Sequence, residues 1–351
     1  MTGGGDCPGL NAVIRAAVKT ATNVYGMEVV GFEDGFRGLV FNQTRPLGYD
    51  DVSNILTQGG TILGTSNKDN FFGIKRNESQ RVLPGQNRTR SALLHFKKHK
   101  LDGMICIGGD GTLTVANHLH NLGIPMVGVP KTIDNDVMLT DQTFGFDSAA
   151  WVATDAVDRL HSTAASHERV MIVEVMGRSA GWIALHAGIA GGGDIILIPE
   201  IPFSLKAVVS VIQKRFKRGR RYALVVVAEG AYQKGSQPIW KKKAHSLSGI
   251  SIQLAEHIQR DSGIECRATI LGHLQRGGSP TPFDRMLATR YGNFAAHLAA
   301  QGRYGEMVCL RNNKIESVSL AEVAGTPRRI LLDSPLLQTA RDVGTSFGDE
   351  T

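Results

Sequence analysis

The chain has 351 residues, of which 42% are hydrophobic and 20% charged, and it is long enough for one large or two ordinary globular domains. Its formal charge of +7 favours an anionic partner, such as nucleic acid, a membrane surface or a phosphorylated metabolite. Aromatic residues make up only 6% and form no array for base stacking, so we expect no nucleic-acid partner and favour phosphorylated metabolites.

The cysteines and the longest apolar runs limit the cellular context. The four cysteines lie far apart and form no CxxC pair, so neither a disulfide framework nor a zinc site is expected. The apolar runs are strand-sized and much shorter than a membrane span, and no charged-then-apolar signal peptide opens the chain. We therefore expect a cytoplasmic protein with no membrane partner.

A glycine-rich stretch at residues 2–9 resembles a phosphate-binding loop, and a helix is predicted after it at residues 11–24. Such a loop normally follows a strand, but only Met1 and Thr2 precede its first glycine here. Either the numbered chain starts inside the natural protein, or the sheet lacks its first strand. We favour the first interpretation.

Five apolar runs have the length and composition of strands buried on both faces: residues 103–109, 124–129, 170–175, 194–198 and 222–227. Amphipathic stretches separate them, including a predicted helix at residues 115–122. This alternation predicts an α/β protein with two doubly wound domains and largely parallel sheets, divided near residue 145. Residues 234–251 are polar and should form an exposed loop leading into a helix. The tail after residue 325 is weakly patterned, and we expect its last ten residues to be disordered.

A glycine motif at residues 108–112 follows the first of these strands, at the end where open α/β sheets bind their ligands. Its glycines let backbone N–H groups face phosphate, and Thr112 can start a helix whose positive end favours anions. Asp110 offers a hard carboxylate suited to Mg²⁺. The motif alone is only moderately specific, because it recurs in NAD kinases and lipid kinases. A tight turn capped by aspartate is the structural alternative.

A second polar segment, residues 130–136, follows the next strand and carries Lys131, Asp134 and Asp136. Phosphoryl transfer to an alcohol needs a base for the hydroxyl proton and a cation for the phosphate. Asp134 can be the base, and Asp136 can help to organise the magnesium side. The alternative is a solvated turn, which explains less well the strand before the segment and the glycine loop nearby.

Seven ordered motifs together resemble the phosphofructokinase family, over roughly residues 3–310: residues 4–11, 59–66, 108–112, 130–136, 173–178, 228–230 and 271–280. The resemblance implies phosphoryl transfer from Mg-ATP to the 1-hydroxyl of fructose 6-phosphate, which gives fructose 1,6-bisphosphate in glycolysis. It also implies an active site in a cleft between two domains. Residues 1–145 with about 275–325 would bind ATP and Mg²⁺, and residues 146–274 with about 326–351 would bind the sugar phosphate.

The resemblance assigns roles to individual residues. Asp134 matches the proton acceptor, Arg178 matches a residue that stabilises charge on the transferring phosphoryl group, and Thr132 lines the same site. Asp110 and Asp136 are the implied Mg²⁺ ligands. The implied donor-binding residues are Gly4, Lys68, Gly109, Asp110, Gly111, Thr112 and Lys131.

The implied sugar-phosphate site is rich in arginine, whose guanidinium fork pairs with phosphate oxygens in a way that lysine cannot reproduce. Glu229 matches an acceptor for sugar hydroxyls. Arg169 and Arg267 match residues that reach across from a neighbouring subunit, which implies a homodimer or homotetramer with shared active sites. Singly, each arginine has the simpler interpretation of a surface charge, so the prediction rests on the set: Thr132, Asp134, Arg169, Met176, Gly177, Arg178, Glu229, Arg267, His273 and Arg276.

The phosphoryl donor is less clear, because the family contains both ATP and pyrophosphate users. Gly111 is typical of ATP users, whereas Lys131 is typical of pyrophosphate users. A side chain at position 111 would occupy the space of the α-phosphate, so we favour ATP. Many bacterial relatives have an arginine near residues 67–68, where Lys68 is the candidate substitute and Asn67 the alternative.

Two other interpretations stay open at this stage. A basic set could form an effector site at a subunit interface of an allosteric enzyme, although a solvated helix face fits equally well: Arg15, Lys19, Arg218, Arg220 and Arg221. A non-catalytic regulatory subunit that binds sugar phosphate is disfavoured, because Asp110, Asp134 and Arg178 are all present.

Overall fold

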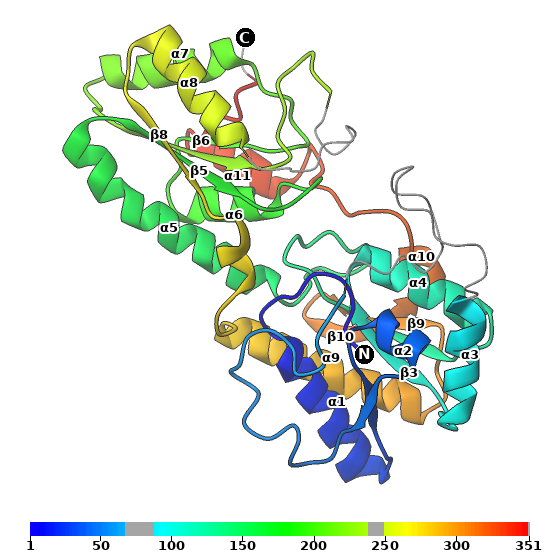
Figure 1. Ribbon diagram of the computed structural model, residues 1–351. Coiled ribbons are helices and arrows are strands. Elements are labelled where there is room, and N and C mark those ends of the chain that lie inside the picture. Colours follow the sequence, from blue (N-terminus) through cyan, green and yellow to red (C-terminus); the bar gives the residue numbers. More distant parts are fainter. Residues whose placement is uncertain (67–87, 238–248, 350–351) are drawn as a thin grey trace. The chain divides into compact units, whose positions relative to one another are not determined.

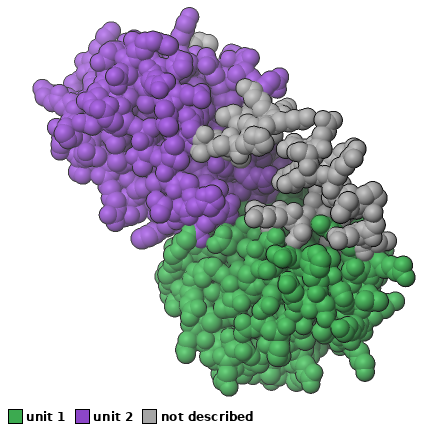
Figure 2. All heavy atoms as spheres, in the orientation of Figure 1, with its two compact units in different colours: residues 1–132, 137–145, 277–326 green, residues 133–136, 146–276, 327–351 purple. Residues whose placement is uncertain are grey.

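The computed structural model describes residues 1–66, 88–237 and 249–349. These form two compact units, each assembled from separate stretches of chain (Figure 2). Unit 1 comprises residues 1–132, 137–145 and 277–326, and unit 2 comprises residues 133–136, 146–276 and 327–351. Because residues from late in the chain complete both units, neither unit is formed by one continuous segment.

The main sheet of unit 1 has the strand order β10-β9-β4-β3. Its strands are β3 (Met104–Gly108), β4 (Met126–Pro130), β9 (Glu306–Arg311) and β10 (Lys314–Ser319). The β3–β4 and β4–β9 pairs are parallel, and only β9–β10 is antiparallel. The first residues of the chain also run parallel to β3, since Ile107 N–H donates to the Met1 carbonyl (3.0 Å) and Gly3 N–H to the Ile107 carbonyl (2.9 Å). The glycine loop therefore follows an extended segment that pairs with the sheet.

Helices cover this sheet, and a two-stranded ribbon lies beside it (Figure 1). Helix α1 contains the helix predicted at residues 11–24, and ten of its 16 residues are buried. It packs against α9 at Gly292, where an added Cβ would lie only 2.4 Å from the Val13 carbonyl oxygen. The bounds are α1 (Leu10–Tyr25), β1 (Val30–Phe32), α2 (Phe36–Phe41), β2 (Thr44–Pro46), α3 (Arg88–Lys98), α4 (Asp110–Asn121), α9 (Pro282–Ala300) and α10 (Leu320–Val323).

Unit 2 contains a parallel four-stranded sheet in the order β6-β7-β5-β8. Every residue of the central strands β5 and β7 is buried, as expected for a sheet covered on both faces. Figure 1 shows α5 and α6 on one face and α7 and α8 on the other. The bounds are α5 (Phe146–His167), β5 (Val170–Val175), α6 (Trp182–Ala190), β6 (Ile195–Leu197), α7 (Leu205–Lys217), β7 (Ala223–Ala228), α8 (Ile250–Ser262), β8 (Cys266–Ile270), η2 (Gly272–Arg276) and α11 (Pro335–Asp342). The predicted α/β class is confirmed.

The expected disorder at the end of the chain is wrong as far as residue 349. Ile196 N–H donates to the Ser346 carbonyl (2.8 Å), the Phe347 side chain is fully buried, and Arg341 forms an ion pair with Asp349 (2.6 Å). The bond to Ile196 reaches a strand about 150 residues away, so no local pattern in the sequence predicts it. Of the predicted loop at residues 234–251, residues 238–248 lie outside the described part, and the helix after it begins at Ile250. Among the described residues, no helix has both the length and the apolar composition needed to cross a bilayer.

Candidate active site

The glycine loop of unit 1 lies against the first turn of α4. Gly4 has a φ of 78° and Gly9 a φ of 102°, both in the left-handed region that favours glycine. The Thr65 hydroxyl holds the loop by donating to the Gly4 carbonyl (2.6 Å). A Cβ atom at Gly3 would lie 2.7 Å from the methyl carbon of Thr112, so only glycine fits between the loop and the helix.

The first turn of α4 offers backbone N–H groups that have no partner within the helix. Gly109 caps the helix in an extended conformation, with no side chain satisfying these groups. Added Cβ atoms would lie 2.3 Å from the Thr112 Cβ at Gly108 and 3.3 Å from the Lys131 carbonyl at Gly109. At Gly111, which is exposed, an added Cβ would have no described atom within 4 Å. Position 111 therefore faces open space, while its neighbours are closely packed.

The helix predicted at residues 115–122 in fact begins at Asp110. The predicted start of the helix was taken from the first apolar residues, but the helix begins directly after its N-cap, Gly109, several residues earlier. Thr112, which was expected to start the helix, lies in its first turn.

Lys131 completes this anion-binding surface from the end of β4. Its side chain is buried, and its ammonium donates a hydrogen bond to the Gly5 carbonyl. The ammonium nitrogen lies 3.6 Å from the position that a Cβ at Gly4 would take. The structure thus brings together six of the seven predicted donor-binding residues: Gly4, Gly109, Asp110, Gly111, Thr112 and Lys131. Lys68, together with its alternative Asn67, lies outside the described residues.

Asp110 fits the role of a Mg²⁺ ligand that acts together with phosphates. Its carboxylate is half-buried and accepts a hydrogen bond from Gly325 N–H (3.1 Å). The described residues contain no cluster of three or more His, Cys, Asp or Glu side chains that could hold a metal. Mg²⁺ commonly binds through one or two carboxylates plus substrate phosphates, so a single carboxylate beside a phosphate-binding loop fits its chemistry. The second implied ligand, Asp136, belongs to unit 2.

The segment after Lys131 carries the predicted base. Thr132 is the last residue of this part of unit 1, and its carbonyl accepts a hydrogen bond from the Thr143 hydroxyl (2.8 Å). Asp134 and Asp136 are both buried, with 4% and 6% exposure, and Asn135 between them has a left-handed φ of 51°. This turn belongs to unit 2, where the Asp136 carbonyl accepts from Arg328 N–H (2.8 Å).

Three predicted residues meet near the carboxyl edge of the sheet in unit 2. Glu229 follows β7 and accepts a hydrogen bond from Arg178 N–H (3.0 Å) in the loop after β5. Burial raises the pKa of Glu229, the Arg178 N–H counteracts this, and the charge of Asp134 raises the pKa further. Asp134 therefore lies close enough to Glu229 for their charges to interact. The loop before α6 is tightly constrained, since Arg178 has a φ of 50° and a Cβ at Gly177 would lie 2.4 Å from the Ala180 carbonyl.

The predicted sugar residues Met176, His273 and Arg276 lie on the same edge. Met176 N–H donates to the side-chain amide oxygen of Gln275 (3.4 Å). The side-chain amide nitrogen of Gln275 donates in turn to the Gly272 carbonyl (3.1 Å). His273 and Arg276 lie beside Gln275 on η2, exposed and half-buried respectively. Sequence reasoning missed Gln275, although it stands between these two residues in their motif.

Arg169 and Arg267 lie at the opposite edge of the sheet. Arg169 immediately precedes β5, and Arg267 is the second residue of the parallel strand β8. Both form ion pairs with Glu265, at 3.5 Å and 2.6 Å, a residue that the motifs did not indicate. At about 3.3 Å per residue, the six residues of β5 separate Arg169 from Met176 by roughly 20 Å. Within one chain, the structure does not bring these two arginines to the other sugar residues.

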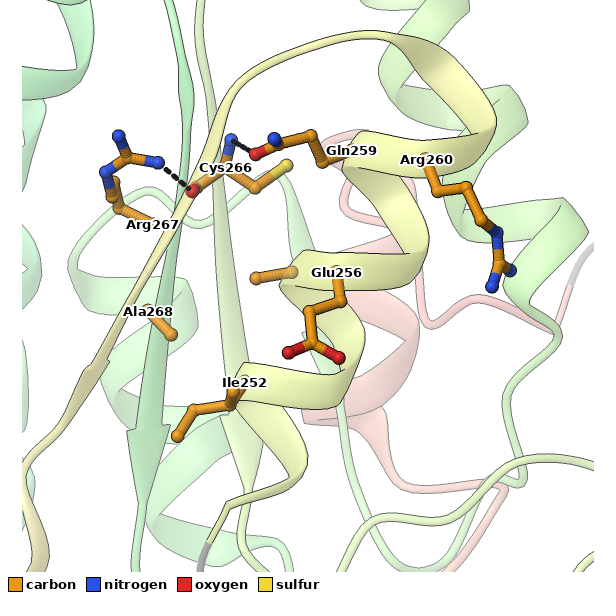
Figure 3. Close-up of a pocket in the computed structure, with 8 residues that line it drawn as sticks. Ile252, Glu256, Gln259, Arg260, Cys266, Arg267 and Ala268 are labelled. Atoms are coloured by element: carbon orange, nitrogen blue, oxygen red, sulfur yellow. Dashed lines mark hydrogen bonds between the residues drawn. The ribbon is translucent and has the colours of Figure 1, made fainter.

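Arg267 also lines a groove of about 660 Å³ between β8 and α8, and its guanidinium points away from α8 (Figure 3). Strand β8 is at the edge of the sheet, and Ile252 in the same groove is 49% exposed. The groove therefore combines exposed apolar surface with a charged side chain beside an open sheet edge.

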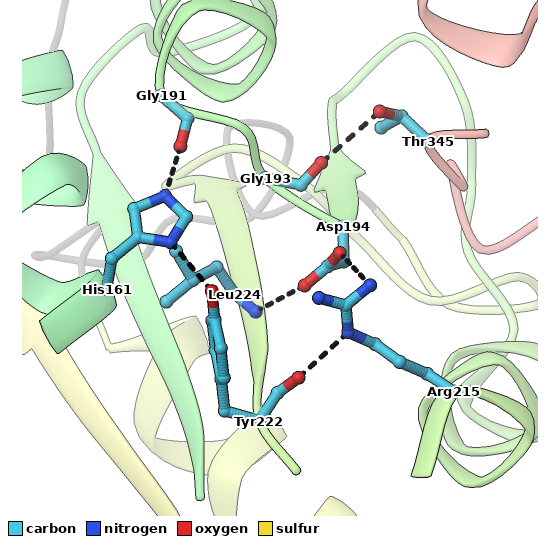
Figure 4. A network of polar contacts seen from close by, with 8 residues as sticks. All are labelled: His161, Gly191, Gly193, Asp194, Arg215, Tyr222, Leu224 and Thr345. Atoms are coloured by element: carbon cyan, nitrogen blue, oxygen red, sulfur yellow. Dashed lines mark hydrogen bonds and ion pairs between the residues drawn. The ribbon is translucent and has the colours of Figure 1, made fainter. Parts of the chain in front are cut away.

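A separate polar network lies where β6 and β7 begin (Figure 4). Asp194 pairs with Arg215 (2.7 Å) and accepts from Leu224 N–H (2.9 Å), while His161 contacts the Gly191 carbonyl (2.7 Å) and the Tyr222 hydroxyl (3.3 Å). Burial raises the pKa of Asp194, and these partners act against that shift. The network ties both strands to α5 and α7.

The basic residues considered for an effector site are divided between the units. Arg15 and Lys19 are on α1, and the Lys19 ammonium lies 3.6 Å from the centre of the Tyr49 ring. Arg218, Arg220 and Arg221 follow α7, and Arg221 forms an ion pair with Glu168. The effector site stays a prediction.

Comparison with known proteins gives a consistent result. The family model described as phosphofructokinase matches residues 1–299. The ATP-dependent 6-phosphofructokinase of Chloroflexus aurantiacus is 50% identical over 351 residues, covering 100% of this chain and 97% of the relative. The enzyme of the same name from Spirochaeta thermophila is 48% identical over 358 residues, covering 99% and 96%.

Solved structures agree with these relatives. The phosphofructokinase of Pichia pastoris in the T-state is 33% identical with a TM-score of 0.80, over 92% of this chain and 34% of that one, so this chain spans about a third of it. The pyrophosphate-dependent phosphofructokinase of Marinobacter aquaeolei has a TM-score of 0.81 at 22% identity, over 98% and 86%, which is a likeness of fold alone. The resemblance seen in the motifs is confirmed, and the chain belongs to the phosphofructokinase family.

Proposed function

We propose that this chain is an ATP-dependent 6-phosphofructokinase, which transfers the γ-phosphoryl group of ATP to the 1-hydroxyl of fructose 6-phosphate in glycolysis. The observation that carries the proposal is the identity of about half of all residues, along the whole chain, with relatives of that name. The presence of Asp110, Asp134 and Arg178 argues against a non-catalytic regulatory subunit.

On the donor side, unit 1 would bind the nucleotide phosphates through backbone N–H groups of the glycine loop and of the first turn of α4. Lys131 would add a cation beside the outer phosphates, and Asp110, with help from Asp136, would hold Mg²⁺. When bound, the metal neutralises charge on the phosphates.

On the acceptor side, Asp134 would take the proton of the 1-hydroxyl as that oxygen attacks the γ-phosphorus and the bond to ADP breaks. Arg178 would stabilise the charge on the phosphoryl group, and Thr132 would line the same position. Glu229, Met176 and Gly177 would contact the sugar, and His273 and Arg276 its 6-phosphate, all from unit 2.

Arg169 and Arg267 would serve the active site of a second copy, in a homodimer or homotetramer. Their position at the opposite edge of the sheet supports this, because one chain cannot direct them to the sugar that Arg178 and Glu229 contact. The groove beside Arg267, with its exposed apolar side chain, suits contact with another subunit (Figure 3).

A pyrophosphate-dependent enzyme is the second candidate, favoured by the buried cation of Lys131. The open space at Gly111 favours ATP, because it leaves room for the α-phosphate. The test is to assay the purified protein with fructose 6-phosphate and Mg²⁺, with ATP and pyrophosphate in parallel. We expect a higher kcat/KM with ATP. Activity with pyrophosphate alone would overturn the donor assignment, and no transfer from either donor would overturn the function.

A further inference from the structure

In unit 2, three stretches that are far apart in the sequence contact one another, and two of them are loops that carry predicted catalytic residues. The first loop, residues 133–136, contains Asp134, and the second, residues 176–181, contains Arg178. The third stretch, residues 327–330, is bonded to the first, since Arg328 N–H donates to the Asp136 carbonyl (2.8 Å). Glu200 links the third stretch to the second, because its carboxylate accepts from both Ile330 N–H (3.1 Å) and Gly181 N–H (3.1 Å).

Arg328 and Trp182 form a direct contact between the third stretch and the first residue of α6, which follows the second loop. The indole N–H of Trp182 donates to the Arg328 carbonyl (3.3 Å), and the guanidinium carbon of Arg328 lies 4.4 Å from the indole centroid. A guanidinium over tryptophan is the most favourable of such cation–π contacts. The ring of His186 packs near Trp182, at 6.4 Å between centroids, and edge-on against Phe146, at 4.9 Å. The indole thus has the Arg328 guanidinium over its ring and the His186 ring near it.

Both loops adopt backbone conformations that require support. Arg178 has a φ of 50° and Asn135 a φ of 51°, in the left-handed region that side chains other than glycine rarely adopt. Such conformations persist only where the surrounding structure fixes them. Arg328 N–H bonds Asp136, next to Asn135, while Glu200 and Trp182 hold the end of the second loop, three and four residues after Arg178.

We infer that Arg328 and Trp182 are positioning residues, which hold the loop of Asp134 and the loop of Arg178 in their working conformations through one shared contact. Neither would touch the substrate. Loss of the contact should lower kcat more than it weakens fructose 6-phosphate binding, because the proposed phosphate anchors His273 and Arg276 lie outside both loops, and only Met176 and Gly177 of the sugar contacts lie in the second. The inference rests on the proposed function, but the loop conformations can be measured without it.

The test compares Arg328→Ala and Trp182→Leu with a matched control, Arg341→Ala. Like Arg328, Arg341 is near the C-terminus and lies over an aromatic ring, that of Phe347 (4.9 Å), and it also forms an ion pair with Asp349. Phe347 and Asp349 belong to neither of the two loops. Misplacement of reacting groups by about 1 Å can cost roughly 100-fold in rate. We therefore expect kcat to fall about 10- to 100-fold in the two test variants, with KM for fructose 6-phosphate within about threefold of wild type. Arg328→Lys should recover part of the loss, and Arg341→Ala should keep the wild-type kcat.

Amide hydrogen exchange provides a readout independent of activity. Exchange at residues 133–136 and 176–181 should accelerate in Arg328→Ala and Trp182→Leu but not in Arg341→Ala. A wild-type kcat and unchanged exchange in Arg328→Ala, in an active enzyme, would overturn the inference. Equal losses in Arg341→Ala would also overturn it, because they would indicate a general effect on stability. Accelerated exchange in a protein that does not phosphorylate fructose 6-phosphate would support the positioning role and refute the proposed function instead.

Discussion

Replacement of Gly111 by aspartate should lower kcat/KM for ATP without destabilising the fold. A Cβ at this position has no described atom within 4 Å, so the new side chain extends into open space. Position 111 is the second residue of α4. Replacing glycine in a helix stabilises the fold by up to about 1 kcal/mol, and an acidic side chain near the helix N-terminus adds about 0.3–1 kcal/mol, reduced by its repulsion from Asp110. The free energy of unfolding should therefore stay the same or rise slightly.

The effect on the donor follows from charge. A carboxylate about 4 Å from the α-phosphate costs about 1 kcal/mol per unit charge in water and about 4 kcal/mol near a protein surface. At about 1.4 kcal/mol per factor of ten, this lowers kcat/KM for ATP by between about fivefold and about 10³-fold. Gly111→Asn, which adds a neutral side chain of similar size, separates steric exclusion from charge repulsion.

The assay measures kcat/KM for ATP and for pyrophosphate at saturating fructose 6-phosphate, together with the melting temperature of each variant. Pyrophosphate has no α-phosphate bearing a nucleoside, so its kcat/KM should change far less than that of ATP. A Gly111→Asp variant that keeps full ATP activity would refute the donor argument. A collapse of the melting temperature would instead show that the space at position 111 had been misjudged.

Three further predictions concern unit 2. Asp134→Ser should lower kcat by about 10²–10⁴-fold with little change in KM for fructose 6-phosphate, whereas Arg267→Ser should mainly raise that KM; similar binding losses in both would contradict the division of roles. When these two variants are mixed and reassembled, some sites regain both an intact base and an intact arginine, and a randomly mixed dimer should recover about a quarter of wild-type activity. No recovery in verified mixed oligomers would contradict shared sites. Burial raises the pKa of Glu229 above 4.5, so the wild-type protein loses stability as pH rises through the pKa of this group in the folded state. The melting temperature of Glu229→Gln should therefore rise relative to that of wild type between pH 4.5 and neutrality. A difference in melting temperature that does not change with pH would contradict this.

Much of the fold could be predicted because strands buried on both faces leave continuous apolar runs. The strands predicted at residues 170–175 and 222–227 lie within one residue of β5 and β7, both of which are fully buried. The β9–β10 hairpin was missed, although its turn residues Asn312 and Asn313 have φ values of 48° and 64°, a pair typical of tight hairpins. Strand β10 is largely exposed and polar, so its apolar signal was weak.

Some residues of the candidate site could be predicted from their local sequence, and others depend on contacts between distant segments. Residues next to strand ends, such as Asp110 and Glu229, could be found because sequence position alone puts them at the edge of a sheet. Gln275, Glu265 and Arg328 act through partners on other segments: 99 residues separate Gln275 from Met176, and Arg328 lies 146 residues from Trp182. Only the folded chain reveals these partners.

The interleaved order of the two units has a consequence for synthesis on the ribosome. Unit 1 needs residues 277–326 to add β9 and α9 to its sheet, and unit 2 needs Ser346 to pair with β6. A nascent chain that has emerged only as far as residue 276 thus displays the apolar faces of both sheets while lacking pieces of each. Such a chain would depend on chaperones or fast elongation until translation ends, more than one whose domains emerge one after the other.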